Sequence, residues 1–166
     1  MGRTTEFRRE LKRTFLPFMT AKGFVLDQRH APHFMDFRRT LADRMQFLEI
    51  QWEKYGRPRF KVSVGQVSAR GTISHGEHID AKDVGPGQAP QYCCLYPQGD
   101  GSSTRHWFRQ DRSFLAALIH RDSLHPPEMP VGQLLELFGE VEEYWLSGKI
   151  GKHLRLISNS WAKDAI

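Results

Sequence analysis

Three consecutive runs in which apolar and polar residues alternate constrain the fold of this chain most strongly. The runs cover residues 33–40, 45–54 and 59–68. In the second run Leu48, Ile50 and Trp52 share one side, and the third run places Phe60, Val62 and Val64 in the same way; the residues between them are mostly polar. A period of two is typical of a strand with one buried face. Short turn-forming connections then predict an antiparallel meander with one buried and one solvated face.

The segment before these strands predicts an amphipathic helix over residues 5–22. Phe7, Leu11 and Phe15 recur at helical spacing, and Gly23 is placed to end the helix. Pro17 removes one backbone hydrogen bond, so we expect a kink near it. This helix is the natural cover for the apolar face of the sheet, after a short extended segment at 24–26.

The pattern after residue 68 is less regular. Residues 69–104 are rich in Gly, Pro and polar residues, which indicates a long irregular excursion and a candidate binding region. Residues 105–109 favour a fourth strand, 113–121 a short helix, and a long helix should begin at Pro130 or Val131. Residues 149–157 are expected to continue as helix. The predicted fold class is α+β, in a single domain of residues 1–166: an antiparallel β-meander of about four or more strands, covered on one face by an N-terminal helix and C-terminal helices.

Composition indicates the kind of domain and its expected cellular location. The 166 residues include 39% hydrophobic and 26% charged residues, a balance suited to one compact domain. The charged N-terminal stretch does not resemble a signal peptide, and no stretch is apolar enough to span a membrane. Cys93 and Cys94 are adjacent, which disfavours a disulfide between them. We therefore expect a cytoplasmic protein without a membrane partner.

Positive charge is concentrated at the N-terminal end of the chain. Residues 1–61 contain 14 Lys or Arg against 7 Asp or Glu, a net charge of +7, whereas residues 62–166 contain 10 against 12, a net charge of −2. Such asymmetry favours a surface for nucleic acid or for an acidic protein, although a solvated face gives the same pattern.

Several segments resemble a known family. They are EFRRELKRTFLPFMTAKGF, HFMDFRR, MQFLEIQWEKYGRPRFKVSVGQVS and the WF of RHWFR. Together they are similar to the bacterial family catalogued as domain of unknown function 4304, over about the first 70 residues. The resemblance implies a small α+β protein, some of whose relatives look like immunity proteins encoded beside secreted toxins. It implies no catalytic residues.

Motifs for chemistry are sparse. His75, Glu77, His78 and Asp80 could act with Cys93 and Cys94 as metal ligands, but their spacing fits a polar loop better than a zinc site. Neither a nucleophile motif nor a phosphate-binding glycine loop is present. We therefore expect no catalytic residues, no metal and no cofactor, and treat a small hydrolase or metal enzyme built on residues 75–94 as a third hypothesis.

Two hypotheses for function are favoured over an enzyme. The first is a non-enzymatic protein-binding module of the immunity type, which would neutralise a partner toxin. The second is a nucleic-acid-associated protein that uses the basic N-terminal third, where aromatic and cationic residues mix. The candidate partner-binding residues are Arg8, Arg9, Lys12, Arg13, Tyr55, Arg57, His75 and His78.

Overall fold

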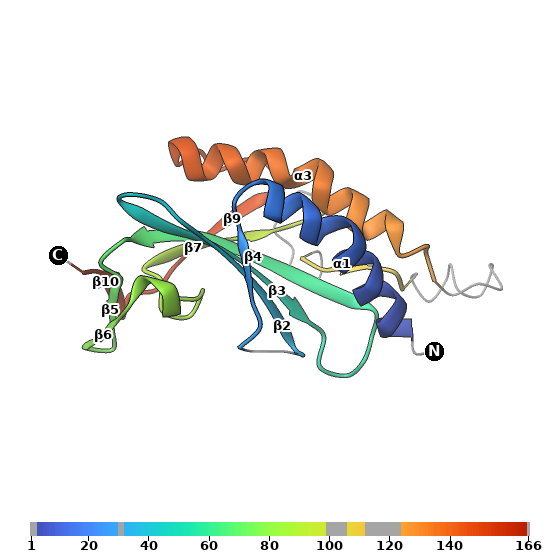
Figure 1. Cartoon of the computed structure of the whole chain (residues 1–166), viewed down its shortest axis with the longest axis horizontal. Helices are drawn as coiled ribbons and strands as arrows, with labels where there is room; N and C mark the ends of the chain where they lie inside the picture. Colours follow the sequence, from blue (N-terminus) through green and yellow to red (C-terminus); the bar gives the residue numbers. More distant parts are fainter. Residues whose placement is uncertain (1–2, 30–31, 99–105, 112–123, 166) are drawn as a thin grey trace.

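A computed structural model describes residues 3–29, 32–98, 106–111 and 124–165 (Figure 1). Two long helices, α1 (Arg3–Ala21) and α3 (Glu128–Ser147), lie on one face of a seven-stranded sheet. The strands of this sheet are β1 (Val25–Asp27), β2 (Phe34–Thr40), β3 (Arg44–Trp52), β4 (Arg59–Ser68), β7 (Gln91–Leu95), β8 (Phe108–Arg109) and β9 (Leu154–Ser158). The predicted α+β class is confirmed.

The two helices end as their sequences require. The N-terminal helix prediction is confirmed by α1, and Gly23 follows it with φ of 82°, a conformation that L side chains rarely adopt. Helix α3 begins two residues before the predicted Pro130 and is closed by Gly148 with φ of 75°. Pro17 lies within α1, which continues to Ala21.

The sheet contains the predicted meander. Strands β1, β2, β3 and β4 are neighbours in sequence order and pair antiparallel, with Leu48 opposite Val64 and Ile50 opposite Val62. Strand β7 then pairs with β4, and β9 pairs with β7 at the edge of the sheet. The predicted strand at 105–109 is confirmed only as β8, two residues long, where Phe108 pairs with Phe60.

Two predictions for the second half are wrong. Residues 69–98 are not irregular throughout: they include strands β5 (Thr72–Ser74) and β6 (Glu77–Ile79), a 3-10 turn η1 (Ala81–Asp83) and strand β7. Residues 149–157 do not continue as helix, because the chain leaves α3 at Gly148 and returns as β9 beside β7. The helix predicted over 113–121 lies outside the described residues.

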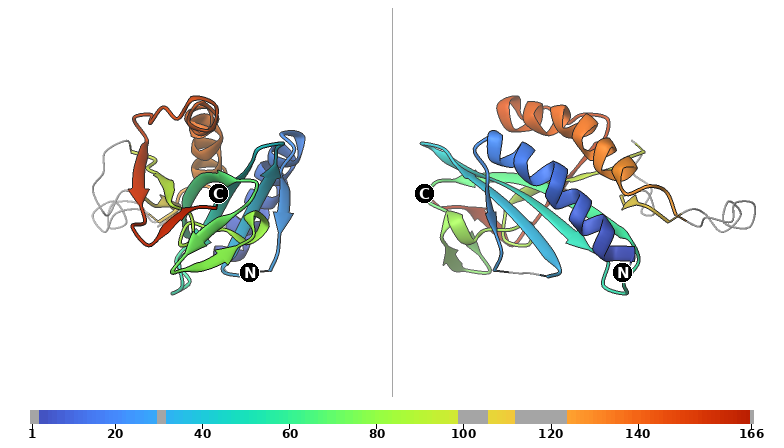
Figure 2. Two further views of the ribbon diagram at one scale, coloured as in Figure 1. Left: turned by 90° about the vertical axis from the view of Figure 1, so that its left-hand side faces the viewer. Right: turned by 45° about the vertical axis from the view of Figure 1, so that its right-hand side comes forward.

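A second, smaller sheet closes the far end of the molecule. Strand β10 (Ala162–Asp164) pairs with β5, and β5 pairs with β6. Both figures place this sheet at the end opposite the N-terminus (Figure 2). None of the helices described in this structure is long and apolar enough to cross a membrane.

The main core lies between the helices and the sheet. Phe7, Leu11 and Phe15 of α1 are fully buried in it. So are the predicted strand residues Leu48, Ile50, Trp52, Phe60, Val62 and Val64. The ring of Phe15 meets Phe37 at 5.6 Å and Phe138 of α3 at 6.1 Å between centroids, which joins both helices to the sheet.

The prediction that the other face is solvated is wrong for part of the sheet. Met45, Phe47 and Val67 form a second apolar cluster there with Val84 and Ala89, which follow η1. The ring of Phe47 lies close to Gly65, where a Cβ atom would come within 2.4 Å of it. The absence of a side chain at Gly65 therefore leaves room for Phe47 to pack on this face of the sheet.

Candidate functional site

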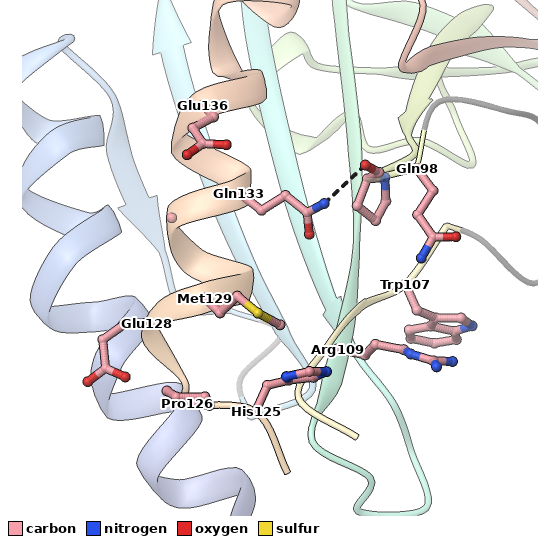
Figure 3. A pocket seen from close by; sticks show the side chains of 11 residues that line it. Gln98, Trp107, Arg109, His125, Pro126, Glu128, Met129, Gln133 and Glu136 are labelled. Atoms are coloured by element: carbon pink, nitrogen blue, oxygen red, sulfur yellow. Dashed lines mark hydrogen bonds between the residues drawn. The ribbon is translucent and has the colours of Figure 1, made fainter. Parts of the chain in front are cut away.

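One open hollow, of about 720 Å³, lies beside the first half of α3. Figure 3 shows Gln133 and Glu136 of α3 on one side of it, and Trp107 and Arg109 on the other. Gln133 donates a hydrogen bond of 3.0 Å from Nε2 to the carbonyl oxygen of Pro97, drawn as a dashed line. Residues 99–105 and 112–123, adjacent in sequence to its lining residues, lie outside the described part of the chain.

The chemistry of this hollow favours no particular ligand. Glu128 and Glu136 bring negative charge and Arg109 brings positive charge to the same space. The guanidinium of Arg59 lies 4.7 Å from the centre of the Trp107 ring, so this ring already has a cation over it. The hollow therefore has no single chemical character.

A second groove, of about 930 Å³, runs between the end of α3 and strands β9 and β10. Ile150 and Leu156 are partly exposed along it, while Arg44, Lys163, Asp43 and Asp164 contribute both signs of charge. The groove is therefore mixed in character as well.

The cysteines are buried thiols rather than reactive ones. Both are free, and burial raises the pKa of Cys93 to about 11 and also raises the pKa of Cys94. A thiol with a raised pKa stays protonated and weakly nucleophilic at neutral pH. Cys94 lies 3.9 Å from Ser63 Oγ, a contact between neighbouring strands. Their arrangement fits packing in a sheet better than covalent catalysis.

The structure brings four of the eight predicted partner-binding residues to one end of the molecule. Thr4 at the start of α1 donates a hydrogen bond of 2.9 Å to the carbonyl oxygen of Gly56, which fixes α1 against the β3–β4 turn. Arg8 and Lys12 follow Thr4 at intervals of four residues, so all three project from one side of the helix. Tyr55 and Arg57 flank Gly56 and are exposed.

Two more predicted residues on α1 project from a different side of the helix and are engaged within the chain. Arg13 forms an ion pair with Glu10 at 2.7 Å, and Glu10 also accepts a hydrogen bond of 2.7 Å from Thr14. These contacts lower the pKa of Glu10 despite the opposing effect of its burial. Arg9 also has a contact within the chain.

The predicted His75 and His78 lie at the opposite end, in the β5–β6 hairpin. His75, with φ of 51°, stacks on Trp161 at 5.6 Å between ring centres. His78 Nε2 lies 2.8 Å from the carbonyl oxygen of Arg70. Within the described ranges no group of three His, Cys, Asp or Glu side chains is arranged to hold a metal ion.

A pocket that the sequence did not predict lies beside Arg8 and Lys12. It has a volume of about 120 Å³ and is bounded by α1, by β1 and by the start of β2. Its apolar lining comes from Leu26, Phe34, Met35 and Trp52. The sequence hint was the cation pair at spacing i, i+4 next to the buried stripe of α1, but the pairing with Trp52 depends on tertiary structure.

Arg8 joins this pocket to the core. Its guanidinium carbon lies 4.9 Å from the centre of the Trp52 ring, and burial lowers the pKa of its side chain. Trp52 is itself only 2% exposed and therefore presents one part of its ring to the cation. No protein-family model, curated protein or solved structure matches the chain, so the geometry of this end of the molecule has to carry the functional argument.

Proposed function

We propose that this chain is a non-enzymatic protein-binding module of the immunity type, which neutralises a partner toxin by covering it. The contact surface is the basic surface, which we define as Arg8, Lys12, Lys54, Tyr55 and Arg57. Its partner would present an acidic surface. The sequence resemblance to domain of unknown function 4304 supports the immunity role, and the free thiols support a reducing, cytoplasmic setting.

Unmatched positive charge is the observation that carries this proposal. Several other arginines are matched within the chain: Arg44 pairs with Asp43 at 2.6 Å, and Arg29 pairs with Asp27 at 2.5 Å. Among the described residues, no carboxylate forms an ion pair with Arg8, Lys12 or Arg57. Unmatched cations on one surface attract an acidic partner and favour one orientation of docking.

The aromatic content of the basic surface also favours a protein partner. Tyr55 is 77% exposed at the tip of the β3–β4 turn, and Lys54 Nζ lies 4.8 Å from the centre of its ring. Tyrosine and arginine are enriched among the residues that dominate protein interfaces. Trp52, which a nucleic-acid binder would use for stacking on bases, is instead buried in the core.

The test is binding to the product of the reading frame adjacent to this gene in its own genome. The two proteins are co-expressed and purified, and their affinity is measured by titration calorimetry. The double variant Lys12→Glu/Arg57→Glu should weaken binding by about tenfold or more, because both positions would then repel an acidic surface. Both side chains are exposed, so the fold should persist.

A matched control makes the same change in net charge at positions outside the basic surface. Lys152→Glu/Lys163→Glu alters two exposed lysines outside the basic surface, one just before the edge strand β9 and one in β10, and should leave the affinity unchanged. Absence of any complex between the two proteins would contradict the proposal. Steeply salt-dependent binding to single-stranded oligonucleotides, lost in the Lys12/Arg57 variant, would favour the nucleic-acid function instead.

A further inference from the structure

The pocket beside Arg8 combines apolar and cationic lining residues. Leu26, Phe34, Met35 and Trp52 line it together with Arg8 and Lys12. Such a combination suits a ligand with a hydrocarbon end and an anionic end.

Neither Arg8 nor Lys12 forms an ion pair with a carboxylate in the described part of the chain. Arg8 Nε is buried and finds no hydrogen-bond partner within the described part of the chain. Lys12 is exposed and forms no ion pair with a described carboxylate. A buried donor without a partner is costly, so an anion placed at Arg8 would satisfy a group that the fold leaves unpaired.

The one carboxylate in the pocket lining is already engaged. Asp27 Oδ2 accepts a hydrogen bond of 2.7 Å from Arg29 and lies 3.4 Å from Arg38 Nε. These contacts hold the pKa of Asp27 at about 2. Because Asp27 is neutralised by two other arginines, the positive charge of Arg8 and Lys12 remains available to a ligand.

The apolar part of the pocket is small and firmly held. The Trp52 ring is fixed by Phe7 and Phe60, each at 5.4 Å between ring centres. A volume of about 120 Å³ is somewhat below that of the roughly 150 Å³ apolar cavities that admit benzene. It therefore suits a branched aliphatic group rather than a fused ring.

We propose that this pocket binds a branched aliphatic monocarboxylate. The carboxylate would lie between Arg8 and Lys12, and the hydrocarbon would pack against Trp52 and Met35. The same chemistry is offered by a free short-chain acid and by the C-terminal residue of a peptide chain. The binding needs no protein partner, so it stands or falls separately from the function proposed above.

The test titrates the isolated full chain with 4-methylpentanoate and with its uncharged analogue 4-methylpentanamide, following the indole resonance of Trp52 by NMR. The acid should produce a saturable shift, and the amide should bind about tenfold more weakly or worse, because it cannot make charge-assisted hydrogen bonds. N-acetyl-leucine, which imitates a peptide C-terminus, is titrated in parallel. Tighter binding of this compound than of the free acid would assign the site to a chain terminus, and the reverse order to a free acid.

Variants locate the binding. Arg8→Gln should weaken binding of the acid by about tenfold, to an affinity close to that of the amide. Lys12→Gln should weaken binding of the acid by less. Lys152→Gln, far from the pocket, should change nothing. Since Lys12 is exposed and its loss should not disturb folding, the Lys12→Gln result stands even if Arg8→Gln fails to fold. Equal binding of acid and amide, no saturable shift with the acid, or unchanged affinity in Lys12→Gln would overturn the proposal.

Discussion

The two faces of the large sheet are covered by different kinds of interaction. The helix-covered face buries a continuous apolar core to which α1, α3 and six strands contribute. The opposite face carries a cluster of five buried residues, roofed by the segment that contains Val84 and Ala89. The first face is held mainly by apolar contacts, with a few polar ones such as the 2.9 Å hydrogen bond from Trp145 Nε1 to the carbonyl oxygen of Gly65. The roof of the second face is fixed mainly by polar contacts.

Those polar contacts come from three directions. Arg38 Nη1 donates a hydrogen bond of 2.5 Å to the carbonyl oxygen of Val84. Arg29 Nη2 donates one of 2.9 Å to the carbonyl oxygen of Lys82, and Arg29 Nη1 pairs with Asp83. Asn159, from the segment after β9, donates hydrogen bonds of 2.8 Å and 2.7 Å to the carbonyl oxygens of Pro86 and Ala89. Stability on this side should therefore respond more strongly to pH and salt than the helix-covered core, where apolar contacts dominate.

The largest effect is expected on the helix-covered face. Phe15→Ala removes a fully buried ring that contacts Phe37 and Phe138, and should cost about 3 to 5 kcal/mol in the free energy of unfolding. Denaturant titration measures this change. Leu146→Ala, at an α3 position that is 87% exposed, should change it by less than about 0.5 kcal/mol. A loss below about 1 kcal/mol for Phe15→Ala would show that the two faces do not differ as described.

A smaller and local effect is expected at the roof. Asn159→Ala leaves one buried and one partly buried carbonyl group without this donor and should cost about 1 to 3 kcal/mol. Amide hydrogen exchange should accelerate at residues 84–92 more than in β3 and β4, because the roof can open while the main core stays closed. Ser160→Ala, at the exposed neighbouring position, is the control. Uniform acceleration across the sheet would mean that the roof and the main core open together.

The same contrast explains what the sequence predicts and what it does not. Phe7, Leu11 and Phe15 on α1, and the alternation through Leu48 and Ile50, are local periodicities that report a large buried face directly. Val84 and Ala89 are isolated among Gly, Pro and charged residues, so nothing in their spacing shows that they cover Phe47. Their burial depends on hydrogen bonds from residues distant in sequence, such as Asn159 and Arg38.

The edge strand β9 and the pocket beside Arg8 could not be predicted from the sequence for a related reason. Residues Leu154 to Ser158 form a strand because β7 offers them a pairing edge, and tertiary context overrides a weak local preference. The pocket needs Arg8 of α1 to meet Trp52 of β3, a contact across two elements. The alternation placed Trp52 in the core correctly, but it could not show that a cation lies over its ring.

The smallest effect concerns Asp27, which anchors the arginines that hold the roof. Its pKa is about 2 in the folded protein, below the ordinary 3.8, chiefly because Arg29 donates a hydrogen bond to it. A depressed pKa means that the carboxylate stabilises the fold above about pH 4 and that this contribution disappears as the pH falls toward 2. Because Arg29 is half exposed, we expect only about 1 kcal/mol at neutral pH.

Asp27→Asn isolates this contribution. The difference in unfolding free energy between the wild type and Asp27→Asn should be constant from pH 7 to about pH 4 and shrink between pH 4 and 2. It should also fall at high salt, since solvent ions screen an ion pair that is partly exposed. Phe15→Ala provides the contrast, because removal of an apolar ring should cost the same across this range. A pH-independent difference for Asp27→Asn would mean that the carboxylate acts through its shape and hydrogen bonding alone, and that charge does not distinguish the roofed face from the helix-covered one.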